Sequence, residues 1–233
     1  MKKILQLFVL LIFTKSIHAQ DCKNYYYLTN NSTVELTIYD RKGSESGKQT
    51  WKIKDLKNQN NGYVSTIESV FTDNKGKESA KSTGTYICSN GILKADMRMA
   101  VPQQQMDAYK DMEVRADEVY IEYPQNMSTG QTLADGVFKM EMYNNNNLST
   151  TINFSQVNRK VEGKENISTP AGSWDAYKIS YEGQFKTMIG GISIPMNFKS
   201  IEWFVPGFGM VKSETYSKNG KLMGSTMLTA YKR

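Results

Sequence analysis

Apolar and polar residues alternate along most of the chain after Asn30, with an apolar side chain at every second position. Within the segment Thr169–Tyr181, for example, Tyr177, Ile179 and Tyr181 fall on one face of an extended chain. Pro170, near the start of this segment, presets the backbone for a turn that precedes the alternating residues. Period-two alternation after a turn is typical of a β-strand with one face in a core.

The same alternation predicts strands in many other segments, and turn residues separate them. Asn90-Gly91 and Gly190-Gly191 each stand between two apolar stretches, which is a strong signal for a two-residue hairpin. The apolar phase shifts between Phe154 and Val157, which predicts a β-bulge. The expected strands are 34–40, 49–54, 63–71, 85–101 with its turn at 90–91, 119–123, 136–143, 148–161, 174–181, 185–189, 192–198, 211–216 and 221–231.

These patterns predict an all-β fold. Sequential hairpins favour a single curved antiparallel sheet or an open, unfinished barrel with meander topology and roughly 11–12 strands. One short helix is expected at Pro102–Lys110, because proline is tolerated at a first helical position.

The first residues have the features of a secretory signal peptide. A basic start, Met1 to Lys3, precedes an apolar run from Ile4 to Phe13 that is short for a membrane span. With cleavage after Ala19, residues 1–19 are the signal peptide and 20–233 form a single all-β domain. We therefore expect a secreted or periplasmic protein with no transmembrane segment after cleavage.

Lipid attachment at the nearby cysteine is not expected, because a lipoprotein signal needs a small residue before the modified cysteine. Asp21 occupies that position before Cys22. Cys22 and Cys88 are the two cysteines of the chain, and in an exported protein such a pair most simply forms a disulfide. The alternative is two separate buried thiols.

Composition excludes several functions. Removing the signal peptide lowers the formal net charge from +6 to +3, which gives little reason to expect nucleic-acid binding. The single histidine, His18, lies in the signal peptide. Without imidazole, catalysis by serine–histidine or cysteine–histidine pairs and histidine-ligated zinc are excluded. We expect a protein that is not an enzyme and that has no cofactor or metal.

The C-terminal half carries motifs of a known group. Asn158–Gly163, Thr169–Gly172, Glu202-Trp203, Gly207–Tyr216 and Lys218–Leu222, with Cys22–Tyr26 and Gly130–Leu133, resemble the TapB-like secreted bacterial proteins. That family is similar to a domain-of-unknown-function group with a curved antiparallel sheet like that of the lipoprotein carriers LolA and LolB. The resemblance implies export and an open barrel, and it brings no catalytic residue.

Methionine and phenylalanine supply the candidate site. Met97, Met99, Phe138, Met140 and Met142 fall on apolar strand faces, and methionine-lined surfaces adapt to varied apolar partners. Paired methionine thioethers also suit Cu(I). However, the expected mature protein has no histidine and no free cysteine to complete a copper site.

Two functions fit these residues. In the first, the concave face of the barrel binds an apolar small molecule such as a lipid or acyl chain. In the second, the same face is filled and the protein is a structural or interaction module that contacts an envelope protein. The aromatic run Tyr25–Tyr27 could stack on sugars or on a partner, or it could form a sheet edge packed near Cys22. An open apolar cavity of at least ~300 Å³ favours the first function.

Overall fold

The computed structural model describes Cys22 and residues 25–59, 62–100 and 111–233. The expected signal peptide and the expected helix at Pro102–Lys110 lie outside these residues. The strands of the described part are β1 (Thr33–Asp40), β2 (Glu45–Gln59), β3 (Gly62–Asp73), β4 (Glu78–Ser89), β5 (Ile92–Asp96), β6 (Glu113–Ala116), β7 (Tyr120–Pro124), β8 (Gly136–Asn144), β9 (Asn147–Thr169), β10 (Gly172–Ile189), β11 (Ile192–Val205), β12 (Gly209–Ser217) and β13 (Leu222–Lys232). Two 3-10 turns, η2 (Tyr26–Leu28) and η3 (Met97–Ala100), accompany them.

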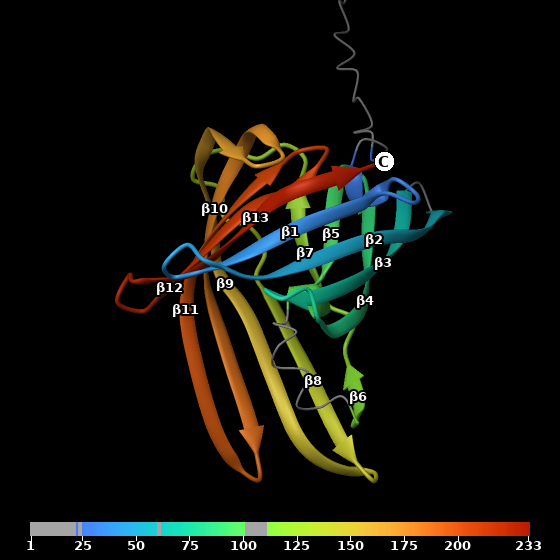
Figure 1. Ribbon diagram of the computed structural model, residues 1–233, viewed down its shortest axis with the longest axis vertical. Helices are drawn as coiled ribbons and strands as arrows, with labels where there is room; N and C mark the ends of the chain where they lie inside the picture. Colours follow the sequence, from blue (N-terminus) through green and yellow to red (C-terminus); the bar gives the residue numbers. More distant parts are fainter. Residues whose placement is uncertain (1–21, 23–24, 60–61, 101–110) are drawn as a thin grey trace, which may run out of the picture.

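All these strands belong to one antiparallel sheet of 13 strands, so the all-β prediction is confirmed. Their order is β6-β8-β9-β10-β11-β12-β13-β1-β2-β3-β4-β5-β7. The sheet is a meander that curls into a half-barrel (Figure 1). The first and last strands pair near its middle, with Val34 opposite Tyr231, and its two edges are the consecutive strands β6 and β7.

The two-residue hairpins form where the sequence predicts them. Asn90 and Gly91 have φ of 51° and 74°, and Gly190 and Gly191 have φ of 55° and 83°. These left-handed conformations match the twist of the flanking strands, and glycine and asparagine adopt them at low cost. They produce the β4–β5 and β10–β11 hairpins.

The predicted bulge lies in β9. Its register against β10 shifts between Val157 and Lys160, and Asn158 adopts φ of 56°. Because of the extra residue, Gln156 and Arg159 both point inward, at 5% and 0% exposure. The bulge therefore sets the side chains that β9 contributes to the interior.

Two strand expectations were wrong. The strand predicted to run to Val101 ends at Asp96, since the Arg98 backbone N–H donates to Asp96 Oδ1 at 2.9 Å and bends the chain into η3. The strand β6 was not predicted, because Glu113–Arg115 are exposed on both faces and show no alternation. The described strands number 13, against the roughly 11–12 expected.

The two ends of the half-barrel differ. At one end the chain after β7 pairs with β9, where Gly130 N–H donates to Val161 O at 2.7 Å and Leu133 N–H donates to Arg159 O at 2.9 Å. At the other end β8, the first half of β9, and residues 183–198 of β10 and β11 extend past the remaining strands (Figure 1). We call this extension the arm. The closed end and the arm share one continuous sheet.

The closed end also contains the Cys22–Cys88 disulfide, which the structure forms as the sequence predicts. Cys88 on β4 is fully buried, and Cys22 is 5% exposed. The bond ties the segment before β1 to the wall of the barrel.

Candidate functional site

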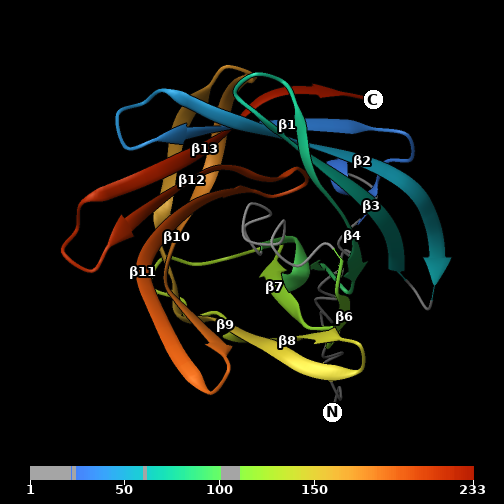
Figure 2. The same cartoon turned by 60° about the horizontal axis from the view of Figure 1, so that its bottom comes forward.

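The half-barrel encloses a cavity of about 440 Å³. We call it the barrel cavity. Figure 2 shows the strands curling around this interior. Its wall is mostly apolar and aromatic and draws on almost every strand. The wall includes Leu36, Trp51, Phe71, Tyr86, Leu93, Ile121, Tyr123, Phe154, Phe185, Met196, Phe198 and Phe204. Its volume falls within the range of small-molecule pockets in proteins.

The aromatic run Tyr25–Tyr27 closes one end of the barrel. Its three side chains are at most 1% exposed, so they are neither an exposed stacking surface nor a sheet edge. Tyr27 lies 5.3 Å from Trp51 and 5.1 Å from Tyr86, ring centre to ring centre. Ser65 Oγ donates to Tyr27 O at 2.7 Å and fixes the turn. We call this run the aromatic plug, and Tyr27 also lines the barrel cavity.

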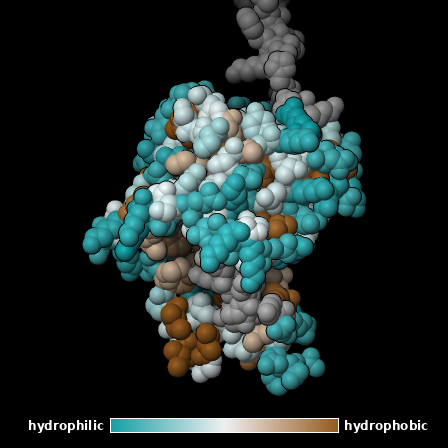
Figure 3. All heavy atoms as spheres, in the orientation of Figure 1, coloured by the Kyte–Doolittle hydropathy of each residue, from teal (hydrophilic) through white to brown (hydrophobic). Residues whose placement is uncertain are grey.

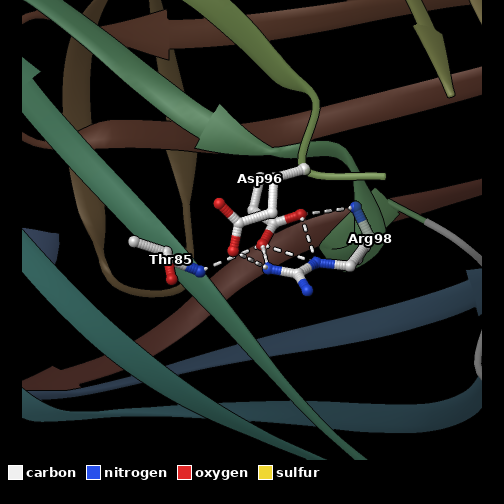
Figure 4. Close-up of polar contacts among 4 residues, drawn as sticks. Thr85, Asp96 and Arg98 are labelled. Carbon is white, nitrogen blue, oxygen red and sulfur yellow. Dashed lines mark hydrogen bonds and ion pairs between the residues drawn. The ribbon is translucent and has the colours of Figure 1, made fainter. Parts of the chain in front are cut away.

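Met97 and Met99 lie on the cavity wall in η3. Two glycines make room for them: a β-carbon on Gly84 would lie 2.4 Å from Met99, and one on Gly136 would lie 2.6 Å from Met97 Sδ. The turn is fixed by Asp96, whose carboxylate accepts bonds from the Thr85 N–H at 3.2 Å and from Arg98 Nε at 2.9–3.0 Å (Figure 4). An ion pair between the buried Asp96 carboxylate and the partly exposed Arg98 therefore positions this part of the wall.

The other three predicted site residues lie elsewhere in the core. Phe138, Met140 and Met142 on β8 are 0%, 5% and 0% exposed, and the described lining of the cavity does not include them. The structure therefore brings Met97 and Met99 to the cavity but not the β8 residues. A ligand-binding role for any of the five stays a prediction.

A buried polar group crosses the barrel near the cavity. Tyr123 from β7 stacks on Phe204 at 4.4 Å and donates its hydroxyl to Glu202 Oε2 at 3.2 Å. Arg159 Nη1 donates to Glu122 O at 3.1 Å and to Ala134 O at 2.8 Å. These bonds join the edge strand β7 to β9 and β11, so they close the seam of the barrel.

Burial sets the electrostatics of this group. Glu202 is 4% exposed, and loss of hydration raises the pKa of its carboxyl above the ordinary value. Arg159 and the Tyr123 hydroxyl oppose this rise. The Arg159 Nη2 atom is 3.8 Å from Glu202 Oε1, which is an ion pair but too long for a hydrogen bond.

The sequence patterns did not identify Glu202, Arg159 or Gln156 as site residues. Glu202 did carry a signal, because it stands in phase with Phe198 and Phe204 on the inward face of β11. A charged residue on an apolar strand face is uncommon and therefore informative. Arg159 carried no comparable sequence signal, because its side chain points inward only as a result of the bulge in β9.

Apolar side chains are exposed at the end of the arm. Around the Gly190-Gly191 turn they cover residues 188–196, which we call the hairpin tip. Figure 3 shows apolar atoms gathered at the lower end of the molecule, where the arm ends in Figure 1. The exposed fractions are 37% for Met188, 44% for Ile189, 69% for Ile192, 55% for Ile194 and 38% for Met196.

The described strands form a curled half-barrel around the cavity. The chain belongs to the DUF3108-like family, which matches residues 29–228. An exported protein with a YmcC-like fold from Bacteroides fragilis is similar at a TM-score of 0.72 and 20% identity, over 88% of this chain and 97% of that one.

A lipoprotein from Parabacteroides distasonis is similar at a TM-score of 0.75 and 22% identity, over 91% of this chain and 100% of that one. Among curated proteins none matches. These matches support the domain-of-unknown-function group and the fold. The narrower resemblance to TapB-like proteins and to LolA and LolB stays a prediction.

Proposed function

We propose that the protein is an exported binding protein that holds an apolar ligand, such as a lipid or acyl chain, inside the barrel cavity. The observation that carries this proposal is the cavity itself. Its volume of about 440 Å³ exceeds the ~300 Å³ from which small-molecule sites begin, and aromatic and aliphatic side chains dominate its wall. A filled structural core would leave no such space.

We also propose that the protein is not an enzyme. In the described residues no group of three or more histidine, cysteine, aspartate or glutamate side chains is placed to hold a metal ion. The chain has no histidine after His18. The buried carboxylates Asp96 and Glu202 are committed to Arg98 and to Tyr123, and neither pairs with a second carboxylate.

The proposal also places the protein outside the cytoplasm and without a lipid anchor at Cys22. One similar structure is described as an exported protein and the other as a lipoprotein. Lipoprotein anchoring uses the cysteine sulfur, and here the Cys22 sulfur is bonded to Cys88. No helix in the described part of the chain has the length and apolar character to cross a membrane.

Filling the cavity tests ligand binding. Thr226 on β13 lines the cavity, and the adjacent Ser225 points to the opposite face of the same strand. We expect Thr226→Trp to weaken binding of the apolar fluorescent probe N-phenyl-1-naphthylamine at least ~10-fold, which corresponds to about 1.4 kcal/mol. The matched control Ser225→Trp should bind the probe as the unmodified protein does.

Ligand carried from the cell gives a second measurement. Native mass spectrometry of protein purified from its own envelope should show a bound apolar molecule, which organic extraction recovers. Absence of any such molecule, together with equal probe binding by the two tryptophan variants, would contradict ligand binding.

The exposed hairpin tip favours a second candidate, an interaction module of the envelope. Exposed apolar clusters on soluble proteins mark contact surfaces. The triple variant Ile189→Ser, Ile192→Ser, Ile194→Ser should then lose crosslinking to an envelope partner while probe binding in the cavity is unchanged. An unaltered crosslinking pattern would argue against the second candidate alone.

A further inference from the structure

We propose that Glu202 recognises the polar end of the ligand, which is a single-chain amphiphile with a hydrogen-bond-donating head group, a hydroxyl or an amine. This inference rests on the proposed binding function. It specifies the chemical class of the ligand and its direction in the barrel.

Glu202 offers a free acceptor at the cavity wall. Its side chain is 5% exposed and lines the cavity. Oε2 accepts the Tyr123 hydroxyl, whereas Oε1 is buried and has no hydrogen-bond partner among the described residues. A buried carboxylate oxygen without a donor is costly, so a ligand that supplies the donor gains affinity there.

Arg159 balances the charge of Glu202 without occupying this acceptor. Its Nη1 is fully used by two backbone carbonyls on the seam, and its Nη2 stays 3.8 Å from Oε1. The side chain is 0% exposed and is absent from the described lining of the cavity. The ligand therefore meets the carboxylate, not the guanidinium, which favours a donor head group over an anionic one.

Neighbouring residues on the same wall are also polar. Tyr181 on β10 and Ser200 on β11 are opposite each other and both line the cavity. Gln156 on β9 lines it as well, and within the described part of the chain its buried Oε1 has no hydrogen-bond partner. Gln156, Tyr181, Ser200 and Glu202 thus add polar groups from β9, β10 and β11 to a mostly apolar wall.

The tail of the amphiphile has an apolar path away from Glu202. Beyond Ser200, Phe198 and Met196 follow on the inward face of β11 toward the arm, and both line the cavity. Phe185 stacks on Phe154 at 4.5 Å beside them. At ~3.3 Å per residue, the six residues from Glu202 to Met196 span about 20 Å, which suits an extended alkyl chain. Ile194 and Ile192 continue the same face to the hairpin tip.

Three dodecyl amphiphiles test the head group. The full-length mature protein is loaded with N-phenyl-1-naphthylamine at pH 8. Dodecanol is then titrated below its solubility limit, and dodecylamine and dodecanoate below their critical micelle concentrations. We expect dodecanol and dodecylamine to displace the probe at concentrations at least ~10-fold below that of dodecanoate. Dodecanoate brings no donor and adds a like charge next to Glu202.

Glu202→Gln should reduce this preference at least ~5-fold, because the carboxamide can donate to a carboxylate. The matched control is Glu182→Gln, which makes the same charge change at an exposed position of β10 outside the cavity lining. It should keep the full preference. The comparison in the unmodified protein needs no variant, so it remains decisive if Glu202→Gln does not fold.

The outcomes separate the two proposals. If neither the probe nor any amphiphile binds the unmodified protein, the proposed binding function fails and this inference fails with it. If the probe binds but the three amphiphiles displace it equally, ligand binding stands and the head-group role of Glu202 is overturned. Glu202 then acts only in closing the seam.

Discussion

The closed end of the barrel and the hairpin tip belong to the same sheet, yet they treat apolar side chains in opposite ways. At the closed end the aromatic plug and η3 pack against the inner face, and Tyr25, Tyr27 and Ile53 are at most 1% exposed. The inner face of the arm is covered unevenly: Phe138 and Met142 on β8 are 0% exposed, whereas Ile192 at the hairpin tip is 69% exposed. The strand pattern is the same in both regions, so only what covers it differs.

This difference separates stability from function. A covered face contributes to the free energy of unfolding through the water that it excludes. An uncovered face contributes little to it, and it is free to contact a ligand or a partner. The barrel cavity lies between the two regions, with Tyr27 at one end and Met196 at the other.

The largest expected effect comes from the aromatic plug. Tyr27→Ala should lower the free energy of unfolding by about 3–5 kcal/mol, because it removes a fully buried ring from the core. Ile192→Ala at the hairpin tip should lower it by less than ~0.5 kcal/mol. Urea denaturation followed by tryptophan fluorescence measures both, and similar losses would erase the distinction between the two regions.

The disulfide should come next. The double variant Cys22→Ser, Cys88→Ser opens a loop with a sequence separation of 66 residues. The chain-entropy estimate for that loop is a loss of about 4 kcal/mol, and measured losses are often smaller. We expect a reduced thermal midpoint, with the arm hairpins unchanged in amide exchange. In the unmodified protein, two free thiols after export to an oxidising compartment would contradict the disulfide.

A smaller effect is expected where the cavity meets the arm. A β-carbon on Gly183 would lie 2.1 Å from the Phe198 ring, so Gly183→Ala should push this ring into the cavity. We expect a loss of about 1–2 kcal/mol in stability and weaker probe binding. Gly163→Ala is the control, since nothing lies within 4 Å of its added carbon. Equal probe binding by both variants would show that Phe198 does not bound the ligand space.

The smallest effect concerns pH and the seam. The folded state raises the pKa of Glu202 above its ordinary 4.5, so above that pH the unfolded chain loses the proton first. The stability that this residue contributes is present below pH 4.5 and is lost as pH rises through the folded pKa. Relative to the unmodified protein, Glu202→Gln should therefore gain stability with rising pH, by at most about 1.4 kcal/mol per pH unit. A constant difference between pH 4 and pH 8 would contradict the raised pKa.

The sequence determined the strands, because alternation and turn chemistry are local properties. The Asn90-Gly91 and Gly190-Gly191 turns, the bulge in β9 and the all-β class can each be read within a few neighbouring residues. The disulfide was also predictable, since only two cysteines are present. The strand β6 was not predicted, because a strand exposed on both faces shows no alternation of apolar and polar residues.

Tertiary structure alone decided which apolar faces are filled and which are open. Met97 and Met140 have similar sequence surroundings, but curling of the sheet places one on the cavity and the other in the packed core. The pairing of β1 with β13 and the seam through Arg159 join residues far apart in the chain. Local patterns carry no information on such contacts, because a strand face looks alike whether it meets a side chain, a ligand or water.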